Sequence, residues 1–502
     1  MIGRIGRILS DVVPLRRGEW KLALFLYGIL TLMVAADWVG KLGADALFVK
    51  RYGVNEIPKM YIVTPLVMLA VSALIFYFVD RIRRRTMLIW YVAAVTLSSL
   101  AIQWFISTSS GAAGEIIQPI SYIFAHGVKE TIYILFWVYA GNLYDVEQSK
   151  RLFPFFAGSV LVGKIIGGAA GAAIAPAVHA ENFIGAQAVG FAVCLLAIIL
   201  YRNLPEGHGQ EAKQAHRPSG LRESLRDSVD GYRTVASDKL LVPFGVGVFF
   251  WYFLMQFANF LYLVGLDQST GTKVGGEDAF SVLYASVYTS SSLVALGIQS
   301  FLTTPLVRRF GVARVLFLLP LWYLASYGAA AWAYGQSLKD LVFPTAVALQ
   351  LGERIVIPSV HRPATELVYT QVSAAIRPRA RAFLSGGVNA IGNMAAAVGL
   401  IAGLALFQTG ALLTAGAVFS GIFALNTWQT RGAFGRRIAE NLASSDEAMR
   451  RNAMDMLHSE GSAVPTDLLR NVADEGSDEV AHGARLALTR RGVLAVAADS
   501  AE

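Results

Sequence analysis

The heptapeptide Val79-Asp-Arg-Ile-Arg-Arg-Arg85 separates two long apolar stretches, near residues 58–79 and 86–106. Six apolar stretches later, the basic sequence Leu306-Val-Arg-Arg-Phe-Gly-Val-Ala-Arg314 stands at the corresponding place. Each loop therefore separates the second from the third apolar stretch in a set of six. This repetition predicts two parallel halves of six helices each, joined end to end.

The chain has room for all twelve helices, because a bilayer crossing takes about 20 apolar residues. Of its 502 residues, 55% are hydrophobic and 16% are charged. Soluble domains carry roughly 25% charged residues. The expected spans lie near 20–40, 58–79, 86–106, 116–144, 152–176, 183–201, 240–266, 280–304, 312–334, 341–372, 382–406 and 409–428. We therefore expect an all-α polytopic membrane protein of twelve transmembrane helices in two halves, with a small soluble α-helical tail.

Arginine and lysine gather in alternate loops, as at 81–85, 150–151, 308–314 and 377–381. The positive-inside rule then places both termini in the cytoplasm of a plasma (inner) membrane, and the net charge of +8 reflects topology rather than nucleic-acid binding. We expect membrane lipid to surround the transmembrane helices. The first outer loop is an exception, since it carries Lys50, Arg51 and Lys59.

Composition also predicts the domains: an N-terminal bundle at 1–201, a basic cytoplasmic linker with a surface helix at 202–239, a C-terminal bundle at 240–430 and a soluble tail at 431–502. In the tail, residues 445–457 and 477–488 match at an offset of 32 residues and resemble HEAT-type helical repeats. Two interpretations remain open. The tail is either loosely packed, or it docks against the membrane domain or a partner protein.

The sequence lacks the signature motifs of several enzyme classes. There is no GxxxxGK[ST] loop for ATP hydrolysis and no HExxH metal motif, and the single cysteine, Cys194, lies in an apolar stretch. We expect no enzymatic activity, no cofactor and no bound metal. Function is instead expected at polar groups placed inside apolar spans, where burial makes them costly.

Charged groups of this kind occur in both halves. In the first half they are Asp37, Lys41, Lys129, Glu130 and Lys164, and in the second they are Glu353 and Arg354. The doublets Lys129-Glu130 and Glu353-Arg354 occupy near-equivalent positions. Either each doublet neutralises itself, or both face one central cavity; Asp37 and Lys41 are likewise either an ion pair within their helix or part of the site.

Two further features accompany the charges. Glycines at four-residue spacing around Lys164 (Gly163, Gly167 and Gly171) predict close helix packing. Asn259, with Gln256 and Tyr262, could bind a ring or simply bond between helices. The lysines 41, 129 and 164 together with Arg354 suit an anionic, phosphorylated small-molecule solute, although the nearby carboxylates oppose that charge.

Parts of the chain resemble known families. Asp80-Arg-Ile-Arg-Arg-Arg85 is similar to the D-R-x-G-R-R loop signature of the major facilitator superfamily, with Arg83 in place of glycine. Arg362-Pro-Ala-Thr-Glu-Leu-Val-Tyr369 resembles the DPAKEMAY stretch of the ATP/ADP translocase family, and 144–154 resembles its TTVDEAKRFYP. Asp45-Ala-Leu-Phe-Val49 followed by Glu56-Ile-Pro58 resembles its DVLVV and EVIP.

The resemblance covers about 20–430 and implies nucleotide exchange. The glutamate of the family's tenth helix falls on Glu366. Its first-helix lysine falls on Ala44, with Lys41 one turn earlier as a possible substitute, and its fourth-helix glutamate falls on Asn142.

We therefore expect a secondary transporter of nucleotides or another phosphorylated anion, working by alternating access. Lys41, Lys129, Lys164, Arg354, Asn259 and Asn142 are expected to bind the solute, and Asp37, Glu130, Glu353 and Glu366 to gate or take protons. Two alternatives remain: a proton-coupled carrier of another organic solute, and a membrane-anchored interaction protein acting through its helical tail.

Overall fold

The computed structural model describes residues 19–79, 82–109, 112–141, 143–144, 146–201, 233, 235–270, 276–338, 341–373, 376–406, 409–460, 463–475, 478–490 and 493. Some expected features lie outside these ranges: the basic segment before Glu19, residues 202–232 of the linker, Asp80, Arg81 and Asn142. The side chains of Lys129 and Glu130 also lie outside the description. The chain divides into two compact units, Met1–Pro218 with Leu263–Leu296, and Ser219–Tyr262 with Gly297–Glu502.

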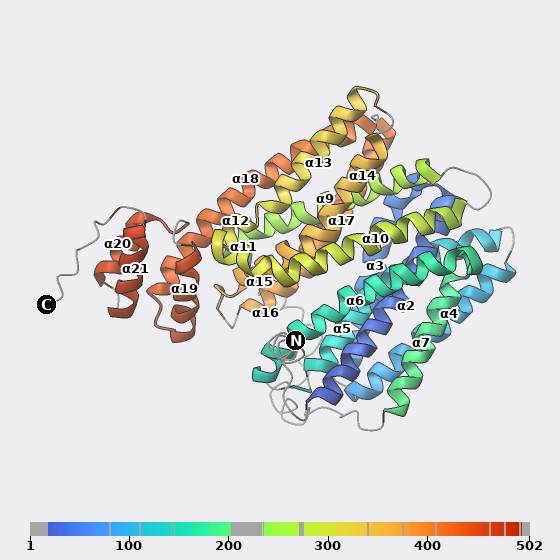
Figure 1. Ribbon diagram of the computed structural model, residues 1–502, viewed down its shortest axis with the longest axis horizontal. Helices are drawn as coiled ribbons and strands as arrows, with labels where there is room; N and C mark the ends of the chain where they lie inside the picture. The colour runs from blue at the N-terminus through green and yellow to red at the C-terminus, as the bar shows by residue number, and fades with distance from the viewer. Residues whose placement is uncertain are drawn as a thin grey trace, which may run out of the picture. The chain divides into compact units, whose positions relative to one another are not determined.

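All regular structure in the described residues is helical, which confirms the expected fold class. The first unit contains α2 (Trp20–Tyr52), α3 (Ile57–Val79), α4 (Arg84–Thr108), α5 (Ala112–Gly141), α6 (Val146–Val178), α7 (Phe183–Leu200), the end of α9 (Leu241–Thr270) and most of α10 (Gly276–Phe301). The helix α2 packs against α5, α6 and α7, and lies beside α6 and α7 in Figure 1.

Glycines of α6 let it approach α2 closely, as their spacing predicts. A Cβ atom added at Gly163 would lie 2.7 Å from the carbonyl oxygen of Thr31, and one added at Gly167 would lie 2.5 Å from that of Ala35. Both distances are far inside van der Waals contact, so no larger residue fits without moving the helices apart. This approach sets how near Lys164 of α6 comes to α2.

The second unit begins with the first part of α9 and the end of α10. It continues with α11 (Thr303–Phe310), α12 (Val312–Val315), α13 (Leu318–Gly335), α14 (Val342–Leu351), α15 (Arg362–Tyr369), α16 (Arg377–Ala382), α17 (Asn389–Leu406) and α18 (Thr409–Leu442). The helices α13 and α18 run side by side (Figure 1). Between α14 and α15 the chain is π-helical, from Gly352 to His361. Pro358 lies inside that segment and has no backbone N–H to donate, which favours a departure from α-helical bonding.

The tail forms three helices, α19 (Glu447–Glu460), α20 (Thr466–Glu475) and α21 (Asp478–Arg490), beyond the end of α18 (Figure 1). They pack on α18, α11 and α12 and share one apolar core with them. The buried Gln371, which follows α15, donates from Nε2 to the carbonyl of Asn452 at 3.3 Å and accepts from Asn441 at 3.0 Å. The docked interpretation of the tail is therefore the one the packing favours; its assignment as a HEAT-type repeat stays a prediction.

In the described part of the chain, nine helical stretches are long and apolar enough to cross a membrane. They coincide with nine of the twelve expected spans. The other three expected spans are also helical, as α3, as α5 and as the α14 to α15 segment, and their crossing of the bilayer stays a prediction. Large apolar side chains such as Leu97 and Trp104 face outward from α4, as lipid contact requires. The chain is an integral membrane protein.

Candidate functional site

A buried aspartate organises the polar centre of the first unit. Asp45 and Lys41 stand one turn apart on α2, and Lys41 Nζ lies 2.8 Å from Asp45 Oδ2. The hydroxyl of Tyr284, on α10, donates to the same oxygen at 3.1 Å. On the other carboxylate oxygen, Oδ1, the Nε2 atom of His126 from α5 lies at 2.9 Å. Three helices thus supply partners to one carboxylate, which is how a charge is held away from water.

Two lysines share an aromatic ring beside this group. Lys41 Nζ lies 5.3 Å from the ring centroid of Trp38, and Lys164 Nζ lies 5.7 Å from the same centroid. Tyr288 of α10 also lies under Lys164, at 5.9 Å, and meets Trp38 edge to face. Desolvated cation–π contacts of this kind are worth about 2 kcal/mol each. They stabilise positive charge without adding a negative group. We call Trp38, Lys41, Asp45, His126, Lys164, Tyr284 and Tyr288 the lysine cluster.

The ion-pair partner of Lys41 is Asp45, whereas the sequence suggested Asp37 for this role. Asp37 and Lys41 are both buried on α2, but the ion pair of Lys41 runs to Asp45, on the next turn in the other direction. Asp37 comes near Tyr91 of α4, close enough to interact with it electrostatically. Asp45 is the better partner for Lys41 because His126 and Tyr284 already hold its carboxylate in place.

A second polar group forms in the second unit, around the π-helical segment. Arg354 is buried there, with its guanidinium 5.3 Å from the ring centroid of Tyr262. Gln350 donates from Nε2 to Glu353 at 2.6 Å and to the side-chain oxygen of Asn259 at 3.3 Å. The structure thus brings together Arg354, Glu353 and Asn259, and adds a glutamine that sequence reasoning missed.

Glu366 stands apart from this group. It pairs with Arg381, and both side chains are half exposed. Arg381 in turn lies over the ring of Tyr369, 5.4 Å from its centroid. This half-exposed pair joins α15 to α16 and differs in setting from the buried Arg354, although Glu366 and Arg354 come from one expected span.

Ion pairs also gather at the end of α2 and involve basic residues assigned from the sequence to the first outer loop. Lys50 Nζ lies 2.5 Å from Asp267 Oδ1, and Arg51 pairs with Glu181 and with Glu277. These acids come from the α6–α7 connection, α9 and α10. Each of these two cations therefore has an acidic partner, but the positive-inside rule counts Lys and Arg alone, so the loop remains an exception to the pattern.

A further pair in the same region joins a histidine to an aspartate. His179 Nδ1 lies 2.8 Å from Asp278 Oδ2, and the other oxygen of Asp278 accepts the backbone N–H of Ala180 at 2.8 Å. The hydrogen bond and the negative charge of Asp278 raise the pKa of the exposed His179 above its ordinary value.

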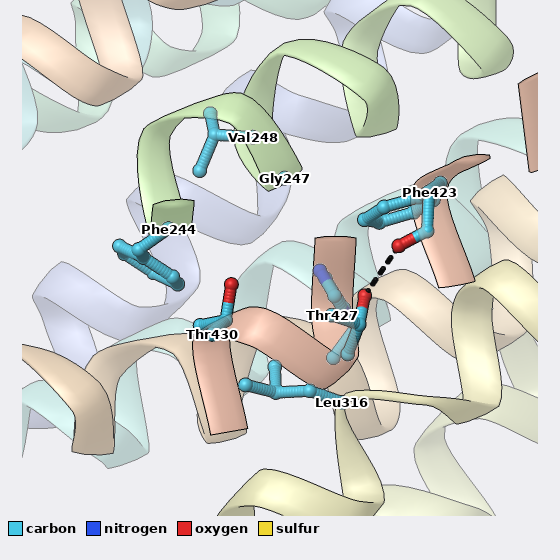
Figure 2. A pocket seen from close by; sticks show the side chains of 8 residues that line it. Phe244, Gly247, Val248, Leu316, Phe423, Thr427 and Thr430 are labelled. Atoms are coloured by element: carbon cyan, nitrogen blue, oxygen red, sulfur yellow. Dashed lines mark hydrogen bonds between the residues drawn. The ribbon is translucent and has the colours of Figure 1, made fainter. Parts of the chain in front are cut away.

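The second unit also contains a small pocket, lined by Phe244, Gly247, Val248, Leu316, His361, Phe423, Thr427 and Thr430 (Figure 2). The hydroxyls of Thr427 and Thr430 donate hydrogen bonds to backbone carbonyls of their own helix. Figure 2 shows the bond from Thr427 to Phe423. The cavity volume is about 20 Å³, enough for one water molecule. It is too small to hold an organic solute.

Among the described residues, no group of three His, Cys, Asp or Glu side chains could hold a metal ion. The expected binding residues fall into three sets. Lys41 and Lys164 join the lysine cluster, with Asp37 nearby on α2; Arg354, Glu353 and Asn259 join the second group; Glu366 belongs to neither. Sequence reasoning gave no role to Trp38, Tyr284 or Tyr288. Only Asp45 left a usable signal, because a carboxylate four residues after Lys41 shares its helix face.

No protein-family model and no curated protein matches the sequence. Solved structures do match the fold. A D-xylose–proton symporter is 13% identical with a TM-score of 0.58, covering 81% of this chain and 97% of its own. The nucleoside transporter NupG is 16% identical with a TM-score of 0.52, covering 82% and 98%. A POT family transporter, solved with a thioalcohol-conjugated peptide, is 15% identical with a TM-score of 0.55, covering 80% and 96%. The chain therefore has the fold of these membrane transporters.

Proposed function

We propose that the protein is a secondary active transporter of a phosphorylated anion, with nucleotides as the leading candidates, and that it works by alternating access. The observation that carries this is that Lys41 Nζ and Lys164 Nζ lie 5.3 Å and 5.7 Å from the ring centroid of Trp38, within the membrane-spanning part of the first unit. Helix packing alone does not require two ammonium groups inside membrane-spanning helices, where charge is costly.

The second unit supports the same solute class. Arg354 is buried over Tyr262, and a guanidinium binds phosphate oxygens with two parallel hydrogen bonds. Aromatic rings next to cations also suit a nucleobase, which stacks on rings and guanidinium planes. The resemblance of residues 362–369 to the ATP/ADP translocase stretch and the nucleoside transporter among the structural neighbours both agree with a nucleotide. The role of each residue is part of the proposal.

Uptake into proteoliposomes tests this function. Purified protein is reconstituted and offered radiolabelled ATP, ADP and inorganic phosphate, with unlabelled nucleotide inside the vesicles. We expect saturable uptake of at least one of the three, and a KM raised about tenfold or more in Lys164→Gln and Arg354→Gln, which corresponds to about 1.4 kcal/mol of binding.

Arg451→Gln is the matched control, since it removes one positive charge from an exposed pair in the tail. It should leave KM unchanged. Absence of saturable uptake of any phosphorylated solute would end the proposal. Flux of an uncharged sugar or peptide driven by a pH gradient, without competition by nucleotides, would favour the other carrier class.

A further inference from the structure

His126 is the group in the lysine cluster that can change its charge in the ordinary pH range. Its Nε2 atom faces Asp45 Oδ1 at 2.9 Å. An ionised carboxylate only accepts hydrogen bonds, so Nε2 must carry the hydrogen, and a second proton added to the ring goes to Nδ1. The His126 side chain is 20% exposed whereas that of Asp45 is 2% exposed, so the histidine is the more accessible of the two groups.

The groups around His126 favour such a step. Tyr122, on the same helix, stacks on the imidazole with ring centroids 4.2 Å apart. Asp45 of α2 lies next to the imidazole. The other oxygen of this carboxylate contacts Lys41 of α2 and the hydroxyl of Tyr284 of α10. Tyr61 of α3 comes near Tyr122. On α5 itself, Lys129 and Glu130 follow one turn further along. Asp45 is the described acidic group in direct contact with the imidazole.

Protonation of His126 would change the net charge of the lysine cluster. With His126 neutral, Lys41 and Lys164 are equal in number to the two buried carboxylates on α2, those of residues 37 and 45. These four groups together then carry no net charge. One proton on Nδ1 of His126 makes the imidazole cationic, and the group gains one positive charge. Asp45 is then shared between two cations, so Lys41 Nζ becomes free to exchange its carboxylate contact for an oxygen of the solute.

We propose that His126 and Asp45 form the proton-binding site of the transporter, and that a proton bound at His126 accompanies the anion. The step is a simple transfer: one proton moves from water to Nδ1, and the same proton leaves when the anion leaves. This inference rests on the proposed function, because it names the ion that moves with the proposed solute.

The first experiment needs no solute. Protein with 15N-labelled histidine is placed in lipid nanodiscs, and the imidazole resonance that disappears in His126→Gln is assigned to His126. We expect this resonance to change from the neutral to the protonated form between about pH 5 and 8. A resonance that keeps one form across this range overturns the proton site, whatever the transport assays show.

The second experiment measures coupling in proteoliposomes with labelled ATP and ADP. With acid outside, wild-type uptake should be severalfold faster than without a gradient, and the interior should acidify as nucleotide enters. In His126→Gln, which can still donate to Asp45 but cannot take a proton, the imposed gradient should no longer change the uptake rate. Asp45→Asn is the second variant, used if the first does not fold, and should lose the dependence as well.

His482→Gln is the control, because this histidine is exposed on the tail helix α21. It should keep the gradient dependence of the wild type. Nucleotide uptake by the wild type that ignores the gradient overturns the inference and leaves the proposed function standing. No uptake under any condition overturns the proposed function, and the resonance measurement then decides the proton site alone.

Discussion

The two units surround the cations of their membrane-spanning helices in different ways. In the first unit, Lys41 and Lys164 lie among carboxylates, a histidine and three aromatic rings, on regular helices. In the second unit, Arg354 lies in a π-helical segment over the ring of Tyr262, next in sequence to Glu353, which accepts a hydrogen bond from Gln350. Histidine changes its charge near neutral pH and arginine does not. Under the proposed proton site, the first unit responds to protons, whereas the second offers a positive charge that does not change with pH.

Removing the carboxylate at the centre of the first unit should have the largest effect. In Asp45→Ala, Lys41 and His126 lose their shared partner inside a buried site. Breaking a buried ion pair in this way costs about 3–5 kcal/mol. Thermal unfolding in detergent measures it, with Glu447→Ala as the control, because that glutamate belongs to a pair that is largely exposed. Equal stability losses for the two variants would contradict the central role of Asp45.

Exchanging the cations sharpens the contrast between the units. Arg354→Lys keeps the charge but loses the planar fork, so the KM for nucleotide should rise about tenfold, or about 1.4 kcal/mol. Lys164→Arg keeps both charge and a cation over Trp38, and its effect should be smaller. Saturation curves for uptake measure both. A larger effect in Lys164→Arg than in Arg354→Lys would reverse the assignment of the fixed charge to the second unit.

The tail belongs to the second unit through a tight contact that can be broken. A Cβ added at Gly435 of α18 would lie 1.9 Å from the carbonyl oxygen of Ala463, whereas one added at Gly432 has no neighbour closer than 3.9 Å. We expect Gly435→Ala to loosen the tail at a cost of about 1–3 kcal/mol and Gly432→Ala to leave it docked. Limited proteolysis between α18 and α19 reports the difference. Nucleotide uptake should survive in both, whereas an anchor acting through its tail would lose its phenotype in the first.

An exposed histidine of the first unit gives the smallest expected effect. Asp278 raises the pKa of His179 in the folded protein, so the pair stabilises the fold fully below the unfolded value of about 6.5. That contribution disappears as the pH rises through the folded value. The melting-temperature difference between wild type and His179→Gln should therefore be largest near pH 5 and vanish at alkaline pH. A melting-temperature difference that grows with pH would contradict a stabilising interaction between protonated His179 and Asp278.

Much of the fold could be predicted because its signals are local. Apolar stretches near 20 residues long predict helices, and basic loops such as 81–85 and 308–314 mark the repeat. The site was predicted in part. Lys41, Lys164 and Arg354 stand out in any apolar stretch, but their partners do not. The expected span 341–372 gave no sign that its centre is π-helical, beyond the presence of Pro358.

The sequence by itself determined that the chain is helical, that it belongs in a membrane and that α2 carries Lys41 and Asp45 on one face, because these depend on composition and on the 3.6-residue period of a helix. The tertiary structure decided that Tyr284, distant in sequence, reaches Asp45, and that one tryptophan serves two lysines. Such contacts depend on how closely helices approach, which is set where Gly163 and Gly167 meet the backbone of α2. The spacing of these glycines predicts a close approach, but it does not tell which helix α6 meets or which side chains that contact brings together.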